Sequence, residues 1–294
     1  MIIKILQILL YVAFIGFAFV FIKDLLKAKK ENTFEDEKIW KPAVTGFVTN
    51  FFDTLGIGSF APSMFFFKAF RHNLRDKQIP GTLNVADALP VMLEAILFIG
   101  ATNVDSVTLV SLIGAAVVGS YVGAGIMSKI KERTVQIVMG VALLISAILF
   151  LASVMKWIPL GGTALGLSGV KLVAGIVIFL GLGMLMTAGV GLYAPAMVVV
   201  YAMGMDPMAA FPIMMGSCAL LMPVASAKFI KENAYAKKNA AIIAISGIIG
   251  VGCAFPFVSS LDIEKLKILV IVVVLATAFM MLKAAFTNKE ENSI

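Results

Sequence analysis

Three acidic residues within apolar segments are the clearest candidates for chemistry. Asp53, Asp87 and Glu94 stand among Phe, Leu, Ile, Val and Ala residues. Asp87 and Glu94 are seven residues apart, which places them on one face of a helix, two turns from each other. Ionisable residues at such a depth in a membrane mark ion or proton pathways. We therefore expect these three residues to couple protons to the activity, the alternative for Glu94 being a structural pair with a lysine.

Two glycine-rich motifs recur at a shift of 133 residues and predict a binding site. Thr54 to Pro62 reads TLGIGSFAP, and Thr187 to Pro195 reads TAGVGLYAP. Because two glycines and a proline disfavour an unbroken helix, each motif predicts two half-helices joined by an unwound stretch. Half-helices that begin after Gly58 and Gly191 direct positive dipole ends into one cavity, where they bind anions without arginine.

Hydroxyls and amides near the motifs complete the predicted anion site. Asn84 and Ser217 follow the two motifs and are related by the same shift. The predicted substrate-binding residues are Thr54, Gly56, Gly58, Ser59, Asn84, Thr187, Gly189, Gly191, Tyr193 and Ser217.

The elements that position these residues are membrane spans. The chain has 294 residues, of which 61% are hydrophobic and 14% charged, and its mean hydropathy is +1.01. Soluble domains are about 45–50% apolar, and one span needs about 20 apolar residues. The composition therefore predicts an all-α polytopic membrane protein without a substantial soluble domain.

The shift of 133 residues extends beyond the motifs and predicts a duplicated chain, since Pro90 also matches Pro223. We expect a first repeat over residues 1–133, a second over residues 134–265, and an extra C-terminal span within residues 266–294. The apolar elements lie near 2–22, 43–70, 80–100 and 106–128 in the first repeat, and near 134–156, 170–203, 208–228 and 239–259 in the second. Close helix packing is expected at Gly114, Gly119, Gly123, Gly247 and Gly252.

The distribution of positive charge predicts how the chain threads the membrane. As one helix, segment 43–70 would be about 42 Å long, against a hydrocarbon core of about 30 Å. If both motif segments are re-entrant hairpins, 19 of the 24 Lys and Arg residues face the cytoplasm. The two hairpins then enter from opposite sides, and the halves are inverted repeats. This threading puts the N-terminus outside and the C-terminus in the cytoplasm.

Several other functions are disfavoured by the composition. Cys218 and Cys253 have no metal-ligand spacing, and His72 is the only histidine, in a basic loop where we expect it to face water. We therefore expect no metal and no cofactor. The net charge of +7 is explained by cytoplasmic loops, and nucleic acid is not expected as a partner.

Inverted repeats with helices broken near the midplane are typical of secondary transporters. The sequence therefore predicts a non-enzymatic permease in the lipid bilayer that moves a small anion by alternating access, with protons as coupling partners. One alternative is a passive anion channel. The other is an intramembrane aspartyl protease that uses Asp53 and Asp87.

The two motif segments, Gly46 to Pro62 and Gly183 to Pro195, resemble those of the sulfite exporter TauE/SafE (TSUP) family of membrane permeases. Family members commonly carry additional glycines after the first Gly-x-Gly, whereas Ser59 and Leu192 follow here. The resemblance implies transport of small anions such as sulfite or short organosulfonates across the inner membrane.

Overall fold

The computed structural model describes residues 2–56, 58–99, 104–127, 132–155, 157, 162–187 and 191–260, and isolated helical residues between 271 and 286. These residues form helices and no strands, apart from one isolated bridge between Ala164 and Met205. Six of the described helices are long and apolar enough to cross a membrane. The predicted all-α polytopic class is therefore confirmed. The predicted C-terminal span lies largely outside the described residues.

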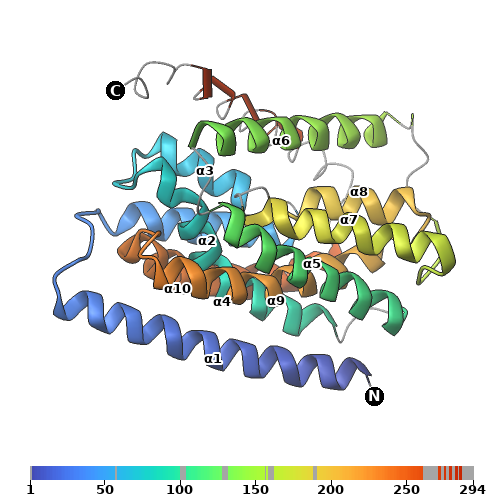
Figure 1. Ribbon diagram of the computed structural model, residues 1–294, viewed down its shortest axis with the longest axis horizontal. Coiled ribbons are helices and arrows are strands. Elements are labelled where there is room, and N and C mark those ends of the chain that lie inside the picture. Colours follow the sequence, from blue (N-terminus) through green and yellow to red (C-terminus); the bar gives the residue numbers. More distant parts are fainter. Residues whose placement is uncertain are drawn as a thin grey trace.

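Two buried helices form the centre of the bundle. The helices α4 (Ile79–Ile99) and α9 (Ala210–Lys231) pack against each other, and each has an internal proline, Pro90 or Pro223. The long helix α1 (Ile2–Lys30) runs along one edge of the molecule and α6 (Glu132–Val154) along the opposite edge (Figure 1). Many of the large apolar residues of α1 are exposed, as expected for a helix that faces lipid.

The remaining long helices connect the two halves of the sequence crosswise. In the first half, α2 (Trp40–Thr54) packs most extensively against α10 (Lys237–Ala254). In the second half, α7 (Gly169–Thr187) packs in the same way against α5 (Ser106–Met127). Since each half supplies a helix to the other's hairpin, the halves form one interlocked core.

The first motif interrupts a helix, as predicted. The helix α2 ends at Thr54, and α3 (Phe60–Ala69) begins after a stretch in which Gly56 and Gly58 have φ of 91° and 88°. Residues other than glycine rarely adopt such φ angles, so these two glycines permit the break in the helix. Lys41 Nζ donates a 2.9 Å hydrogen bond to Arg71 O and thereby joins the start of α2 to the end of α3. We call this unit the first hairpin.

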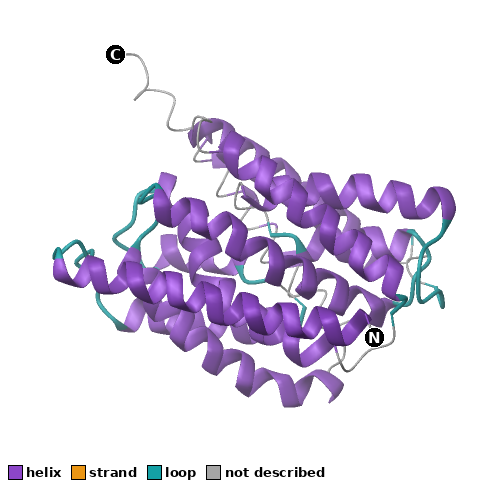
Figure 2. Ribbon diagram, turned by 60° about the horizontal axis from the view of Figure 1, so that its bottom comes forward, coloured by secondary structure: helices purple, strands orange, loops and turns teal. Residues whose placement is uncertain are grey.

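The second motif produces a matching unit. The helix α7 ends at Thr187, and α8 (Tyr193–Ala202) runs back, so that Lys171 Nζ donates a 3.1 Å hydrogen bond to Met203 O. We call this unit the second hairpin. Figure 2 shows loops at both ends of the bundle and short loop segments within it.

The two hairpins open at different ends of the bundle. The first opens at what we call the basic end, where residues 31–38, 71–78 and 231–238 meet through bonds such as Gln78 Nε2 to Tyr235 O. The second opens where α5 and α9 begin, next to the backbone bonds from Asp105 N to Leu165 O and from Asp206 N to Ala164 O. Each hairpin therefore places its broken tip inside the bundle.

Three of the five glycines expected to allow close packing do so. A Cβ atom at Gly119 would lie 2.0 Å from Leu180 O, and those at Gly123 and Gly247 would lie within 3 Å of neighbouring atoms. The prediction is wrong for Gly114 and Gly252, where an added Cβ atom would meet no other described part of the protein within 4 Å because both lie on outward faces of α5 and α10.

The prediction that His72 faces water is also wrong. Its side chain is buried between α2 and α10, with Nδ1 2.7 Å from Asn239 Oδ1 and Nε2 3.2 Å from Thr45 Oγ1. The backbone turns back at Arg71, whose φ is 50°, and so directs His72 inward. Burial lowers the pKa of His72 and outweighs the opposing effects of Asn239 and Glu37.

Candidate functional site

A small buried cavity lies where the two hairpin tips meet. It is lined by Asp53, Gly58, Ser59, Phe60, Val91, Met186, Gly191, Leu192, Tyr193, Cys218 and Met222. Its volume of about 10 Å³ is room for about one water molecule. Since a sulfur oxyanion has at least four heavy atoms, the cavity in this conformation is too small to hold such a substrate.

The tips contact each other reciprocally across this cavity. A Cβ atom at Gly58 would lie 3.6 Å from Tyr193 Cβ, and one at Gly191 would lie 3.6 Å from Phe60 Cβ. Phe60 begins α3 and Tyr193 begins α8, so the first turns of both half-helices border the same space. The positive ends of two helix dipoles therefore converge there.

The three acids are all buried beside the cavity and differ in their hydrogen bonds. Glu94 accepts from Thr54 Oγ1 at 2.9 Å and from Tyr193 OH at 2.8 Å, so both of its oxygens have donors. Asp87 Oδ1 accepts from Asn50 Nδ2 at 3.1 Å, whereas its Oδ2 has no partner among the described residues.

Asp53 is the acid that lines the cavity. By hydrogen-bond geometry, neither of its carboxyl oxygens has a partner among the described residues, and the polar residue Ser59 lines the same cavity. In the described part of the chain, no lysine or arginine forms an ion pair with any of the three acids. The donors to the two oxygens of Glu94 are hydroxyl groups, and no described lysine pairs with it.

The other predicted site residues fall into two groups. Gly58, Ser59, Gly191 and Tyr193 line the cavity together with Asp53. The remaining described residues are not part of the lining: Thr54 bonds Glu94, a Cβ atom at Gly56 would meet Met197 and Phe211, Thr187 bonds Met184 O, Asn84 bonds Pro80 O, and the buried Ser217 hydroxyl has no partner among the described residues. Gly189 lies outside the described residues.

Sequence reasoning missed Asn50 and most of the apolar lining. Asn50 stands one helical turn before Thr54 in a predicted span, so its polarity was a usable signal. Val91, Met186, Cys218 and Met222 carried no such signal, because Met and Val occur throughout the apolar segments. Cys218 Sγ lies 3.6 Å from Met186 Sδ.

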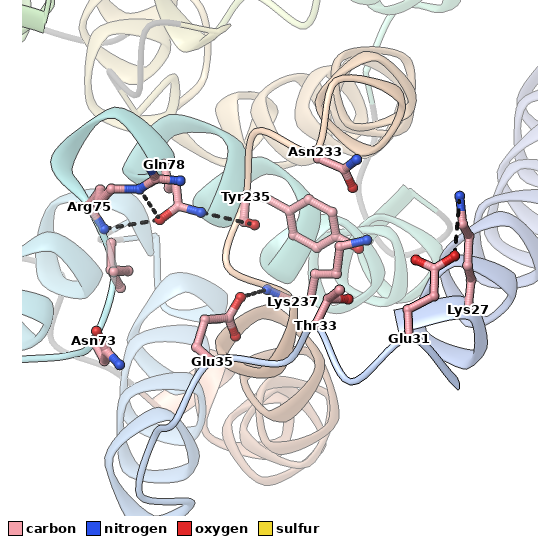
Figure 3. Close-up of a pocket in the computed structure, with 11 residues that line it drawn as sticks. Lys27, Glu31, Thr33, Glu35, Asn73, Arg75, Gln78, Asn233, Tyr235 and Lys237 are labelled. Carbon is pink, nitrogen blue, oxygen red and sulfur yellow. Dashed lines mark hydrogen bonds and ion pairs between the residues drawn. The ribbon is translucent and has the colours of Figure 1, made fainter. Parts of the chain in front are cut away.

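A larger cavity of about 550 Å³ lies at the basic end (Figure 3). Its charged groups mostly contact one another: Lys237 Nζ pairs with Asp24 at 2.9 Å, and the Glu35 carboxylate accepts from the backbone N–H groups of Lys237 and Lys238. Arg75 contacts Gln78, and Lys27 lies 3.9 Å from Glu31. These pairs stabilise the loops, and no described acid, histidine or cysteine residues are grouped as for a metal ion.

Two broken helices whose tips meet inside an all-helical membrane protein are typical of secondary transporters. Comparison with known families agrees with this class. The family model described as sulfite exporter TauE/SafE matches residues 2–150, which is half of the chain, and the protein belongs to this transporter family. The matched region includes the first motif and all three acids, whereas the second motif lies beyond it. No curated protein and no solved structure matches the chain.

Proposed function

We propose that this protein is a secondary transporter that moves a small anion, sulfite or a short organosulfonate, across the inner membrane by alternating access. The observation that carries the proposal is the convergence of two half-helix N-termini, one from each hairpin, on one buried cavity. Such ends stabilise an anion through backbone dipoles. Membership in the sulfite exporter family supports the sulfur oxyanion as the substrate class.

Three features support alternating access between two inverted repeats, residues 1–133 and 134–265. The hairpins open at opposite ends of the bundle. Their tips make the reciprocal contacts of Gly58 and Gly191, as two related units facing each other would. Since the cavity holds about one water molecule, the present arrangement corresponds to a closed state between outward and inward openings.

Proton coupling follows from the charges around the cavity. An ionised Asp53 beside the bound anion would repel it, and no described lysine or arginine offsets that repulsion. A neutral carboxyl removes the repulsion and is far less costly to bury than an unpaired carboxylate. Asp53 therefore carries the proton that accompanies the anion, with Asp87 and Glu94 as further coupling residues.

The basic end is assigned to the cytoplasm because Lys and Arg residues gather there. This orientation places the start of α1 outside and makes the first hairpin open inward.

The closed cavity distinguishes this proposal from the two alternatives. A passive channel needs a continuous path wide enough for the anion, whereas this cavity has room for about one water molecule. An aspartyl protease needs two aspartates facing one space, but Asp53 lines the cavity whereas Asp87 bonds Asn50 outside its lining.

Flux into proteoliposomes tests the proposed function. Purified protein is assayed with sulfite, thiosulfate, sulfoacetate, isethionate and a carboxylate anion, with and without a pH gradient. We expect saturable flux of a sulfur oxyanion that increases with the gradient. Non-saturable flux would favour a channel, and absence of anion flux would contradict the proposal.

A further inference from the structure

The hydrogen bonds of Glu94 join parts of the molecule that are far apart in the sequence. Its Oε1 accepts from Thr54, the last residue of α2 before the break in the first hairpin. Its Oε2 accepts from Tyr193, the first residue of α8 after the break in the second hairpin. One carboxyl group on α4 therefore contacts both tips, and its side chain is fully buried.

We propose that Glu94 is a positioning residue that holds the two hairpin tips together in the closed state. This inference rests on alternating access as the proposed function. When either hairpin moves relative to α4 and opens the cavity to one side, the bond from Tyr193 or the bond from Thr54 has to break. Loss of a buried hydrogen bond that leaves its partner unsatisfied is enough to change the relative population of the closed state by about tenfold.

The connection exists once and has no counterpart in the other half. At the shift of 133 residues, Glu94 corresponds to Ala227 on α9, and Tyr193 corresponds to Phe60. Neither replacement can form the equivalent bond, and Thr187, the counterpart of Thr54, donates to Met184 O instead. The bridge is therefore a specific contact of α4 and is not a product of the repeated backbone.

The hydroxyl of Thr54 also has a second acceptor, which defines a conservative variant. Thr54 Oγ1 lies 2.9 Å from Asn50 O as well as 2.9 Å from Glu94 Oε1. In Glu94→Gln, the amide oxygen accepts from Tyr193 and the amide N–H donates to Thr54, whose hydroxyl then turns to Asn50 O. We expect this variant to keep both contacts, whereas Glu94→Ala loses both and Tyr193→Phe loses one.

Distances between the hairpins test the bridge without using transport. Spin labels are placed at Val44 on α2 and Val173 on α7, which are 40% and 61% exposed, in a Cys253→Ser background, and the protein is studied in nanodiscs. We expect one dominant distance in the unmodified background and in Glu94→Gln. Longer distances should gain about tenfold in relative population in Tyr193→Phe. Glu94→Ala/Tyr193→Phe should be no more open than Glu94→Ala, because both remove the same bond.

Transport gives the second readout and a matched control. We expect Glu94→Ala to lower turnover by at least about tenfold and Glu94→Gln to recover most of it. Tyr121→Phe, at a 74% exposed tyrosine of α5, should change nothing. Additive effects of Glu94→Ala and Tyr193→Phe on the distances, or unchanged distances in both, would overturn the bridge even if anion flux is observed. If the double variant is no more open than Glu94→Ala but no anion flux is observed, the bridge is retained and the proposed function is contradicted.

Discussion

The two hairpins share a backbone arrangement and differ in their side chains. Both break at a glycine motif, both turn back at a residue with positive φ, Arg71 or Gly204, and both are closed by a lysine that bonds a carbonyl. The first hairpin has three polar side chains near its break that have apolar residues or glycine as counterparts in the second. Asn50, Asp53 and Ser59 correspond to Gly183, Met186 and Leu192 in the second.

This difference separates two tasks within one cavity. The half-helix ends, which we propose attract an anion through the backbone, are present in both hairpins. The groups that can carry protons lie in the first half, on α2 and α4. We infer that the shared backbone binds the substrate and that the side chains of the first half couple it to protons.

The largest expected effect comes from filling the shared cavity. Gly191→Leu inserts a side chain where a Cβ atom already lies 3.6 Å from Phe60 Cβ, in a space for about one water molecule. We expect anion flux to fall by at least about hundredfold, because the two tips can no longer approach around the substrate. Proteoliposome flux measures the change. Gly252→Leu, at an outward-facing glycine, is the control, and equal loss in both variants would contradict the site.

The next effect is on stability and concerns the packing of α2 and α7, the first helices of the two hairpins. A Cβ atom at Gly183 of α7 would lie 2.1 Å from Ala116 O, whereas Gly181, on the same helix, has no neighbour within 4 Å. We expect Gly183→Val to lower the free energy of unfolding by about 3 kcal/mol and Gly181→Val to change it far less. Denaturation in detergent compares the two. Because a Cβ atom at Gly46 of α2 would lie 2.5 Å from Ile243 O, Gly46→Val should also be destabilising. If Gly46→Val leaves the free energy of unfolding unchanged, α2 and α7 are not packed in equivalent ways.

Proton coupling is expected to depend on one hairpin only. Asp53→Asn should remove the response of flux to a pH gradient, which is worth up to about tenfold per pH unit. Met186→Leu, at the corresponding position of the second hairpin, should retain that response. Asp87→Asn should have an intermediate effect, since Asp87 lies behind the cavity lining. Flux with and without a gradient decides this, and full gradient dependence in Asp53→Asn would exclude Asp53 as the coupling residue.

The smallest effect concerns the open ends of the hairpins and their response to pH. At the basic end, burial lowers the pKa of His72, which faces Glu37 and Lys41. The folded state therefore binds fewer protons there than the unfolded state, and stability decreases as pH falls below about 6.5. At the other end, hydrogen bonds from Thr108 lower the pKa of Asp105, so that stability is lost only as pH falls below about 4.

Hydrogen exchange at pH 7, 5.5 and 4 distinguishes the two ends. Amides of residues 71–78 and 237–240 should lose protection by pH 5.5, whereas those of residues 105–109 should remain protected until about pH 4. His72→Gln should remove the change between pH 7 and 5.5. Simultaneous loss of protection at both ends would show that His72 does not control the basic end.

The apolar helices and the positions of their breaks could be predicted from the amino-acid sequence. Composition and length define apolar spans because each span must satisfy its backbone hydrogen bonds internally in lipid. The breaks at Gly56 and Gly58 and before Phe60 follow from local backbone preferences, which neighbouring residues largely decide. Asp53, Asp87 and Glu94 were identifiable because a carboxyl group in an apolar segment is costly.

Which faces of these helices meet could not be predicted and became visible in the folded arrangement. It showed that Glu94 joins Thr54 to Tyr193, a residue 99 positions away, and that Asp53 lines the cavity whereas Asp87 does not. It also corrected His72, which is buried against Asn239, 167 positions away, and Gly114, which faces outward. The rotation of each helix against its neighbours depends on contacts between distant segments, and local patterns of hydropathy do not encode those contacts.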